Sequence, residues 1–158
     1  MNRRTWSLHS EALGRSMDLA CWGDVGEPVL LFPTAGGDFL ECERFKLIHV
    51  LSPLIEAGRI KVYACGSISS EAWLDPGAHP AHKAWMQTLF DRYLHGELLP
   101  AIRQDCGGYD RIIGAGASLG AFNAVLGACR RPGDFAAVVA MSGTYFFERW
   151  MDGWSDEN

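Results

Sequence analysis

The sequence predicts an α/β fold: a mostly parallel sheet with helices on both of its faces. After two stretches in which polar and apolar residues alternate, short apolar runs alternate with helical stretches. The run Pro28–Phe32 is apolar throughout, as in a strand that is covered on both faces. A serine boxed by glycines, Ser118 in the stretch GAGASLG, stands between another apolar run and a helical stretch.

The first elements along the chain are strands. Trp6–His9 and Met17–Trp22 alternate polar with apolar residues, as half-buried antiparallel strands do. Glycines and a proline then mark a turn, which leads into the apolar strand Pro28–Phe32. That strand ends at Pro33–Gly37, a loop with little side chain in it.

Two helical stretches and one strand follow. Apolar residues recur at three- and four-residue steps from Leu40 to Ala57, and Gly58 is a natural stop for this helix. Ile60–Ala64 is typical of a strand. A long amphipathic helix is expected over Ala81–Gln104, and Pro100 is expected to kink it or split it in two.

The remaining elements repeat the strand–helix–strand order. Arg111–Gly114 predicts a strand, Leu119–Cys129 a helix and Phe135–Met141 a further strand. The tail Tyr145–Asn158 is aromatic and acidic without periodicity, so no helix is predicted to cover the last strand. A parallel sheet that stops there leaves an unpaired apolar edge, which favours association.

Composition narrows the function classes. The length of 158 residues fits one domain, and 48% hydrophobic with 21% charged residues is typical of a globular protein. A net charge of −5 with scattered arginines excludes nucleic acid as an expected partner. Five cysteines without CxxC spacing indicate reduced thiols and a cytoplasmic location. No stretch approaches the ~20 apolar residues of a membrane helix, and no signal peptide is recognisable.

No cofactor or metal is expected. His79 and His82 have a spacing that could suggest a metal pair, but no third ligand stands near them. Pro80 between them favours the start of a helix instead.

Ser118 is the candidate nucleophile. A tight strand-to-helix turn that exposes its hydroxyl needs small neighbours, which Gly116 and Gly120 provide. The same turn aims the following helix at the reacting carbonyl, so the Leu119 amide is a candidate oxyanion-hole donor. The alternative is a structural role in which the serine only caps the helix.

The loop after the first apolar strand is the candidate for the second oxyanion donor. An acyl-transfer site needs two amides that converge on one oxygen. By position we favour the Ala35 amide, and Gly36 and Gly37 are expected to leave the loop backbone open to substrate. An ordinary glycine turn before a helix is the alternative.

The chain resembles the α/β-hydrolase superfamily, in particular its putative-esterase (esterase D-like) branch. The matching pieces are LLFPTAGGDF, IKVYACGS, HPAHKAW and IIGAGASLGAFNAVLGACRRPGDFAAVVAMSGTY, in family order from about Pro28 to Tyr145. The resemblance implies an α/β-hydrolase fold, Ser118 as nucleophile, and Ala35 and Leu119 as the oxyanion hole. It also implies a small-molecule carboxylic ester as substrate, although an acyltransferase would share all of these features.

Residues that contact the substrate are constrained less closely. Thr34 and Gly36 flank the favoured oxyanion donor, while Trp73 and Tyr145 flank the presumed site in the order of the chain. These four residues are the candidate substrate-binding set. Core or rim packing is the alternative for the two aromatic residues.

The general base is missing from the expected place. In the family the acid and the histidine follow the serine. Here every histidine precedes Ser118, namely His9, His49, His79, His82 and His95. The acids that follow it are Asp134, Glu148, Asp152, Asp156 and Glu157. Loss of such a histidine costs about 10⁶ in rate, or roughly 8 kcal/mol, so this chain alone is expected to be nearly inactive by the usual mechanism.

Residues 1–158 are interpreted as a single, incomplete-looking α/β-hydrolase domain. It stops after the strand that follows the nucleophile helix. Three interpretations of its function follow. In the first and favoured one, the rest of a serine esterase lies in another segment. In the second, the protein completes its site by self-association or with a partner, with His79 or His82 as base. In the third, it is a non-catalytic binding or assembly module.

Overall fold

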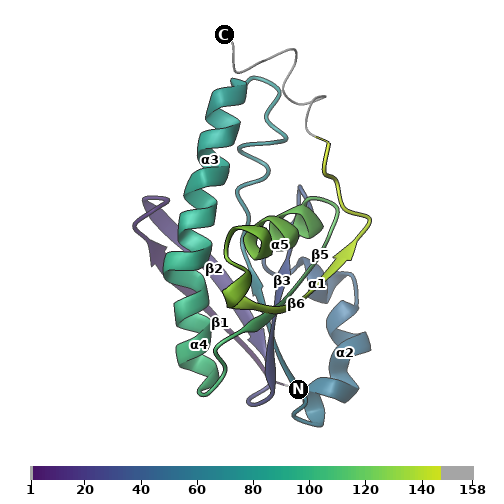
Figure 1. Cartoon of the computed structure of the whole chain (residues 1–158). Coiled ribbons are helices and arrows are strands. Elements are labelled where there is room, and N and C mark those ends of the chain that lie inside the picture. Colours follow the sequence, from purple (N-terminus) through teal and green to yellow (C-terminus); the bar gives the residue numbers. More distant parts are fainter. Residues whose placement is uncertain (1, 147–158) are drawn as a thin grey trace.

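A computed structural model describes residues 2–146 of the chain (Figure 1). Its six-stranded sheet has the order β1-β2-β4-β3-β5-β6. The strands are β1 (Arg3–Ser10), β2 (Arg15–Trp22), β3 (Glu27–Phe32), β4 (Ile60–Cys65), β5 (Ile112–Ala117) and β6 (Phe135–Met141). Strand β2 pairs antiparallel with β1 and β4, whereas β4, β3, β5 and β6 are mutually parallel. The predicted fold class is confirmed.

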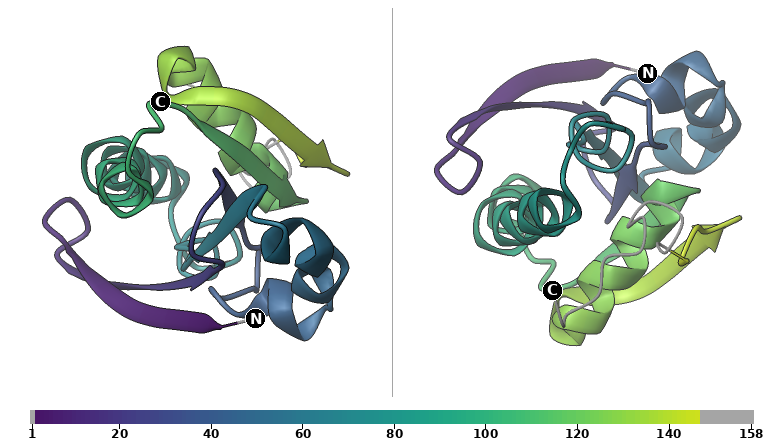
Figure 2. Two further views of the ribbon diagram at one scale, coloured as in Figure 1. Left: turned by 90° about the horizontal axis from the view of Figure 1, so that it is seen from below. Right: turned by 90° about the horizontal axis from the view of Figure 1, so that it is seen from above.

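Helices cover both faces of the sheet (Figure 2). They are α1 (Glu41–Arg44), α2 (Leu47–Glu56), α3 (Pro80–Tyr93), α4 (Leu99–Cys106) and α5 (Leu119–Arg130), with a π-helical turn at Leu94–Leu98 and a 3₁₀ turn at Pro132–Asp134. Helices α3, α4 and α5 bury one apolar core against the sheet, and α2 buries the second core against the opposite face.

Two predicted helices are interrupted. The stretch from Leu40 to Ala57 is broken where Lys46 adopts the left-handed conformation, with φ 65°. The long helix is divided as predicted, and a π-helical turn separates its two parts immediately before Pro100. A proline ring displaces the carbonyl four residues earlier, and here that carbonyl belongs to Gly96 inside the π-helical turn.

A polar cluster ties the N-terminal strand to α4. Asp105 accepts hydrogen bonds from Arg4 (2.7 and 3.2 Å) and Tyr63 (2.7 Å) and pairs with the buried Lys61 Nζ at 2.7 Å. Partial burial opposes the charge on Asp105, but these three donors outweigh it and hold the pKa of Asp105 well below its usual value.

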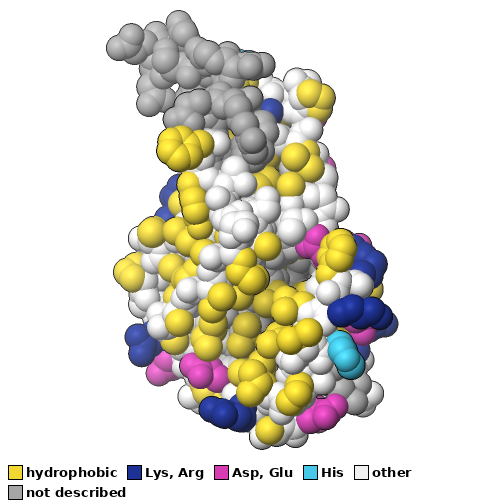
Figure 3. Space-filling model, turned by 90° about the vertical axis from the view of Figure 1, so that its right-hand side faces the viewer, with side chains coloured by type: hydrophobic (Ala, Val, Ile, Leu, Met, Phe, Trp, Pro, Cys, Tyr) yellow, Lys and Arg dark blue, Asp and Glu magenta, His cyan; other side chains and the backbone are white. Residues whose placement is uncertain are grey.

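The last described strand is poorly covered. Within residues 2–146 no strand pairs with the outer edge of β6, as predicted. Val139 and Met141 are 51% and 42% exposed, and Phe45 and Val50 on the neighbouring helical layer are 76% and 70% exposed. Hydrophobic side chains gather across this side of the molecule (Figure 3). Such an apolar patch marks a surface that is suited to bind another polypeptide.

The described residues include no helix that is both long and apolar enough to cross a membrane. All five cysteines are free thiols. Burial raises the pKa of Cys42 and of Cys65 to about 12, whereas Cys129 is exposed.

Candidate active site

Ser118 occupies a strained turn between β5 and α5. Its backbone has φ 56° and ψ −122°, a conformation that residues with a Cβ adopt rarely and at a cost of about 1–3 kcal/mol. The turn is held from the neighbouring strand: Ser118 N donates to Met141 O at 3.0 Å, and Thr144 N donates to Ser118 O at 3.3 Å. A strained residue persists only where its surroundings fix it, and these bonds fix Ser118.

The glycines on either side of Ser118 are required by close packing. A Cβ at Gly116 would lie 2.4 Å from the carbonyl carbon of Gly120. A Cβ at Gly120 would lie 2.3 Å from Phe32 O and 2.7 Å from Pro33 O. These are contacts with main-chain atoms, so no side-chain movement relieves them. The Ser118 turn is therefore packed directly against the loop that follows β3.

Within residues 2–146, the hydroxyl of Ser118 makes no hydrogen bond. Ser118 stands at the N-cap of α5, yet its side chain makes no capping hydrogen bond. The structure therefore gives no support to the alternative in which this serine merely caps the helix. The first amides of α5, beginning with Leu119 N, have no partner within the helix, and the helix dipole adds partial positive charge there.

The Pro33–Gly37 loop forms a tight turn beside Ser118. Gly37 N donates to Thr34 O at 3.1 Å, which places Ala35 and Gly36 at the centre of the turn. Thr34 donates twice to Glu41, from its N at 2.7 Å and from its Oγ1 at 2.5 Å. The Ala35 amide makes no hydrogen bond to another group in the described part of the chain.

One expectation about this loop is wrong. Gly36 is open, with no atom within 4 Å of the position of a Cβ, as predicted. Gly37 is closed, because a Cβ there would lie 2.3–2.7 Å from the carboxylate of Glu41. Sequence reasoning missed Glu41. Its only signal was an acid soon after a glycine loop, and the charged neighbours Asp38, Glu43 and Arg44 gave no reason to single it out.

The two aromatic candidates lie in different settings. Trp73 is 6% exposed, donates from its indole nitrogen to Gln87 at 2.9 Å, and meets Phe122 of α5 edge to face. Tyr145 is 49% exposed and follows Thr144, whose amide binds Ser118 O. Tyr145 therefore follows directly on a residue that is hydrogen-bonded to Ser118. Trp73, in contrast, belongs to the apolar core that α5 helps to form.

An apolar groove of about 340 Å³ lies beside the Ser118 turn, at Gly116 and Ala117. Residues from β5, β6, the Pro33–Gly37 loop and α1 line it, among them Ala117, Met141, Thr34 and Glu41. Phe45 and Met141 belong both to the lining of this groove and to the exposed apolar side chains described above.

Within residues 2–146, no hydrogen bond joins a histidine to Ser118. The buried His95 binds Asp134 through Nδ1 at 2.7 Å, and Arg103 binds the same carboxylate at 2.6 Å. Burial opposes the charge on Asp134, but Arg103 and His95 keep the pKa of Asp134 below its usual value. Asp134 directly precedes β6, whereas Ser118 N donates to the carbonyl oxygen of Met141, the last residue of β6. The length of this strand therefore separates Asp134 from Ser118 by roughly 20 Å.

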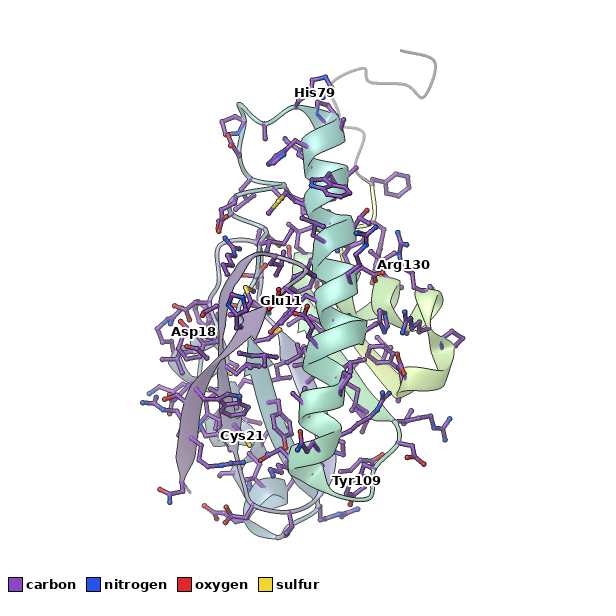
Figure 4. All side chains as sticks on the ribbon, turned by 90° about the vertical axis from the view of Figure 1, so that its left-hand side faces the viewer. Glu11, Asp18, Cys21, His79, Tyr109 and Arg130 are labelled. Carbon is purple, nitrogen blue, oxygen red and sulfur yellow. The ribbon has the colours of Figure 1, made fainter. Side chains whose placement is uncertain are left out.

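His79 has a local role. Its Nδ1 accepts a hydrogen bond from Ala81 N at 3.2 Å, which makes it the N-cap of α3. It lies at the exposed N-terminal tip of that helix (Figure 4), and His82 is exposed on the first turn. The helix start that Pro80 favoured is confirmed. Among the described residues, no group of three or more potential ligands is placed to hold a metal ion. The tail acids from Glu148 onward lie outside the described residues.

A family model described as "Putative esterase" matches residues 66–153. Solved structures share the fold. A ferulic acid esterase is 21% identical, with a TM-score of 0.66, over 90% of this chain and 58% of its own. Fluorophosphonate-binding serine hydrolase F of Staphylococcus aureus, solved with substrate bound, is 16% identical, with a TM-score of 0.70, over 98% of this chain and 62% of its own. Ferric enterobactin esterase of Salmonella typhimurium is 18% identical, with a TM-score of 0.66, over 92% of this chain and 37% of its own.

The chain thus spans between about a third and two thirds of the length of these structures. No curated protein sequence matches it.

Proposed function

The chain belongs to the putative esterase family, and from this premise we propose that it hydrolyses small carboxylic esters through an acyl-enzyme formed on Ser118. The observation that carries the proposal is the strained backbone of Ser118, φ 56° in a non-glycine residue, packed directly against the Pro33–Gly37 loop. Strain of this kind persists at sites where it serves a mechanism, because elsewhere it only costs stability.

In the proposed reaction, Ser118 Oγ transfers its proton to a general base and bonds to the ester carbonyl carbon. The electron pair of the carbonyl bond moves to its oxygen, and the Leu119 and Ala35 amides donate hydrogen bonds to that oxyanion. Collapse of the intermediate breaks the bond to the alkoxide, which takes the proton back from the base. Water then repeats the sequence and releases the acid. Thr34, Gly36, Trp73 and Tyr145 remain the candidate substrate contacts.

The general base and its acid partner are proposed to come from further hydrolase polypeptide that packs on the outer side of β6. This surface is apolar and ends at Met141, which lines the groove of about 340 Å³ and whose carbonyl oxygen accepts a hydrogen bond from Ser118 N. The matched structures are longer than the shared region, which favours additional hydrolase polypeptide as the occupant over an unrelated partner. A cytoplasmic location stays a prediction from the free cysteines.

Fluorophosphonate labelling tests the proposed nucleophile. The Ser118 oxygen–phosphorus bond forms, the phosphorus–fluorine bond breaks, and the hydroxyl proton passes to a base. We expect slow labelling of the chain, faster labelling when imidazole is added as a base, and none in Ser118→Ala, each read by intact mass. Ser142→Ala is the matched control, because Ser142 is exposed and also has a positive φ of 46°. Absence of labelling in every condition would reject Ser118 as nucleophile.

Two further measurements address the alternatives. Products formed from an activated ester in the presence of an alcohol separate hydrolysis from acyl transfer. Light scattering with intact-mass analysis shows whether a second polypeptide or a second copy of the chain covers β6. A monomer with no companion that still turns over esters would contradict the proposed source of the base.

A further inference from the structure

We propose that Glu41 is the positioning residue of the oxyanion hole: it fixes the Pro33–Gly37 loop so that the Ala35 amide, and not its neighbour, faces the reacting oxygen. This inference rests on the proposed function of Ser118. Among the described residues, Glu41 is the only acid whose side chain is buried, at 9% exposure. A buried carboxylate is costly unless donors surround it, so its partners indicate what it does.

Both partners of Glu41 come from one residue of the loop. Thr34 N donates to Oε2 at 2.7 Å, and Thr34 Oγ1 donates to Oε1 at 2.5 Å. Glu41 also fills the space beside Gly37, where a Cβ would lie 2.3–2.7 Å from the carboxylate. The acid therefore holds both ends of the turn: one end by hydrogen bonds, the other by close packing.

These bonds decide which loop amide is available. Thr34 N is committed to Glu41, and Gly37 N is committed to Thr34 O. Ala35 N and Gly36 N remain at the centre of the turn, and Ala35 is the nearer of the two along the chain to β3 and to Phe32 and Pro33, whose carbonyl oxygens pack against Gly120. If the carboxylate were lost, Thr34 N would become an unsatisfied donor, and the peptide units of the turn would be free to rotate.

Glu41 is itself held in place. Its amide donates to Asp38 O at 3.0 Å, and the Asp38 side chain accepts from Leu40 N at 2.8 Å and from Arg44 at 2.7 Å. The turn, α1 and the acid thus form one connected unit. A carboxylate near an oxyanion would repel it, so the benefit of Glu41 is geometric and does not come from its charge. An uncharged group of the same shape is therefore expected to replace it.

Three variants test the inference. Glu41→Gln keeps an oxygen for Thr34 N and presents an amide group to Thr34 Oγ1, so we expect a labelling rate within about threefold of the wild type. Thr34→Val keeps the main-chain bond and loses the hydroxyl bond, with an expected loss of about tenfold. Glu41→Ala removes both bonds, and its labelling rate with fluorophosphonate should fall about 10²-fold, the cost of one misplaced oxyanion donor.

A spectroscopic signature separates positioning from mere stability. In the phosphonylated protein, the phosphonyl oxygen takes the place of the oxyanion, and amides that bind it shift downfield in ¹H–¹⁵N spectra. We expect the Ala35 and Leu119 amides to shift in the wild type and in Glu41→Gln. In Glu41→Ala we expect only Leu119 to shift. An Ala35 shift equal to that of the wild type in Glu41→Ala would overturn the inference, whereas an unlabelled wild type would reject the proposed function instead.

If the wild type is not labelled, hydrogen exchange decides the positioning role alone. Exchange of the Thr34 amide should speed up about tenfold or more in Glu41→Ala and stay slow in Glu41→Gln. Equal exchange in all three proteins would show that Glu41 does not hold the loop. Thr34→Val serves as a second variant should Glu41→Ala fail to fold.

Discussion

Gly120→Ala is expected to separate the Ser118 turn from the Pro33–Gly37 loop. The added Cβ would lie 2.3 Å from Phe32 O and 2.7 Å from Pro33 O, where ordinary contacts begin near 3.4 Å. The two main-chain segments must therefore part by roughly 1 Å, because no side chain can give way. Overpacking against main-chain atoms is expected to lower the free energy of unfolding by about 3 kcal/mol, the upper end of the usual range for overpacked cores.

Urea unfolding measures this loss. With a slope of about 2 kcal/mol per molar urea, the midpoint should fall by roughly 1.5 M, and the melting temperature by roughly 6–12 °C. The same displacement of the loop should slow fluorophosphonate labelling of Ser118 by about 10²-fold. Gly133→Ala is the matched control, because no atom lies within 4 Å of a Cβ there. A Gly120→Ala midpoint equal to that of Gly133→Ala would refute the close packing of turn and loop.

Three further predictions concern strain, charge and thiols. Ser118→Gly should be more stable than Ser118→Ala by about 1 kcal/mol in urea unfolding, because glycine relieves the positive φ that alanine retains; equal midpoints would contradict the strain. Asp105→Asn should cost roughly 2 kcal/mol at pH 7 because it leaves the buried Lys61 without its carboxylate. The pKa of Asp105 is lower in the folded than in the unfolded protein, so its contribution to the free energy of unfolding is fully present above the unfolded pKa of about 4. That contribution is lost as the pH falls through the folded pKa. A difference in the free energy of unfolding between wild type and Asp105→Asn that grows as the pH falls would contradict this prediction. In alkylation at pH 8 followed by peptide mass analysis, Cys129 should react first and Cys65 last, since Cys65 is buried and its burial raises the pKa of its thiol to about 12; early modification of Cys65 would argue against its burial.

The strands and the nucleophile turn could be predicted from the sequence because their signals are local. The apolar run Pro28–Phe32 and the glycines around Ser118 each carry their own information, and β3 and the turn lie where these patterns place them. Steric exclusion explains both glycines, since a Cβ at Gly116 or Gly120 would lie within 3 Å of main-chain atoms.

The parts that could not be predicted depend on contacts between elements. Glu41 binds a residue seven positions earlier across a loop, and no periodic pattern encodes that geometry. His95 binds Asp134 across 39 positions, a pairing that only the packing of the π-helical turn against β6 creates. The left-handed Lys46 that breaks the predicted helix is equally invisible, because lysine carries no preference for that conformation.

The arrangement of the site separates two tasks that a serine hydrolase combines. In the proposed mechanism, binding of the oxyanion depends on Leu119, Ala35 and the Glu41 contact, all within the elements around β3 and β5. Proton transfer depends on a base, and the buried His95 lies roughly 20 Å away at the other end of β6, engaged with Asp134. Added imidazole should therefore raise the labelling rate by the same factor in the wild type and in Glu41→Ala, since it replaces the base and leaves the hole unchanged. A factor that differs between the two proteins would mean that Glu41 also influences the proton, and its role would then extend beyond positioning the loop.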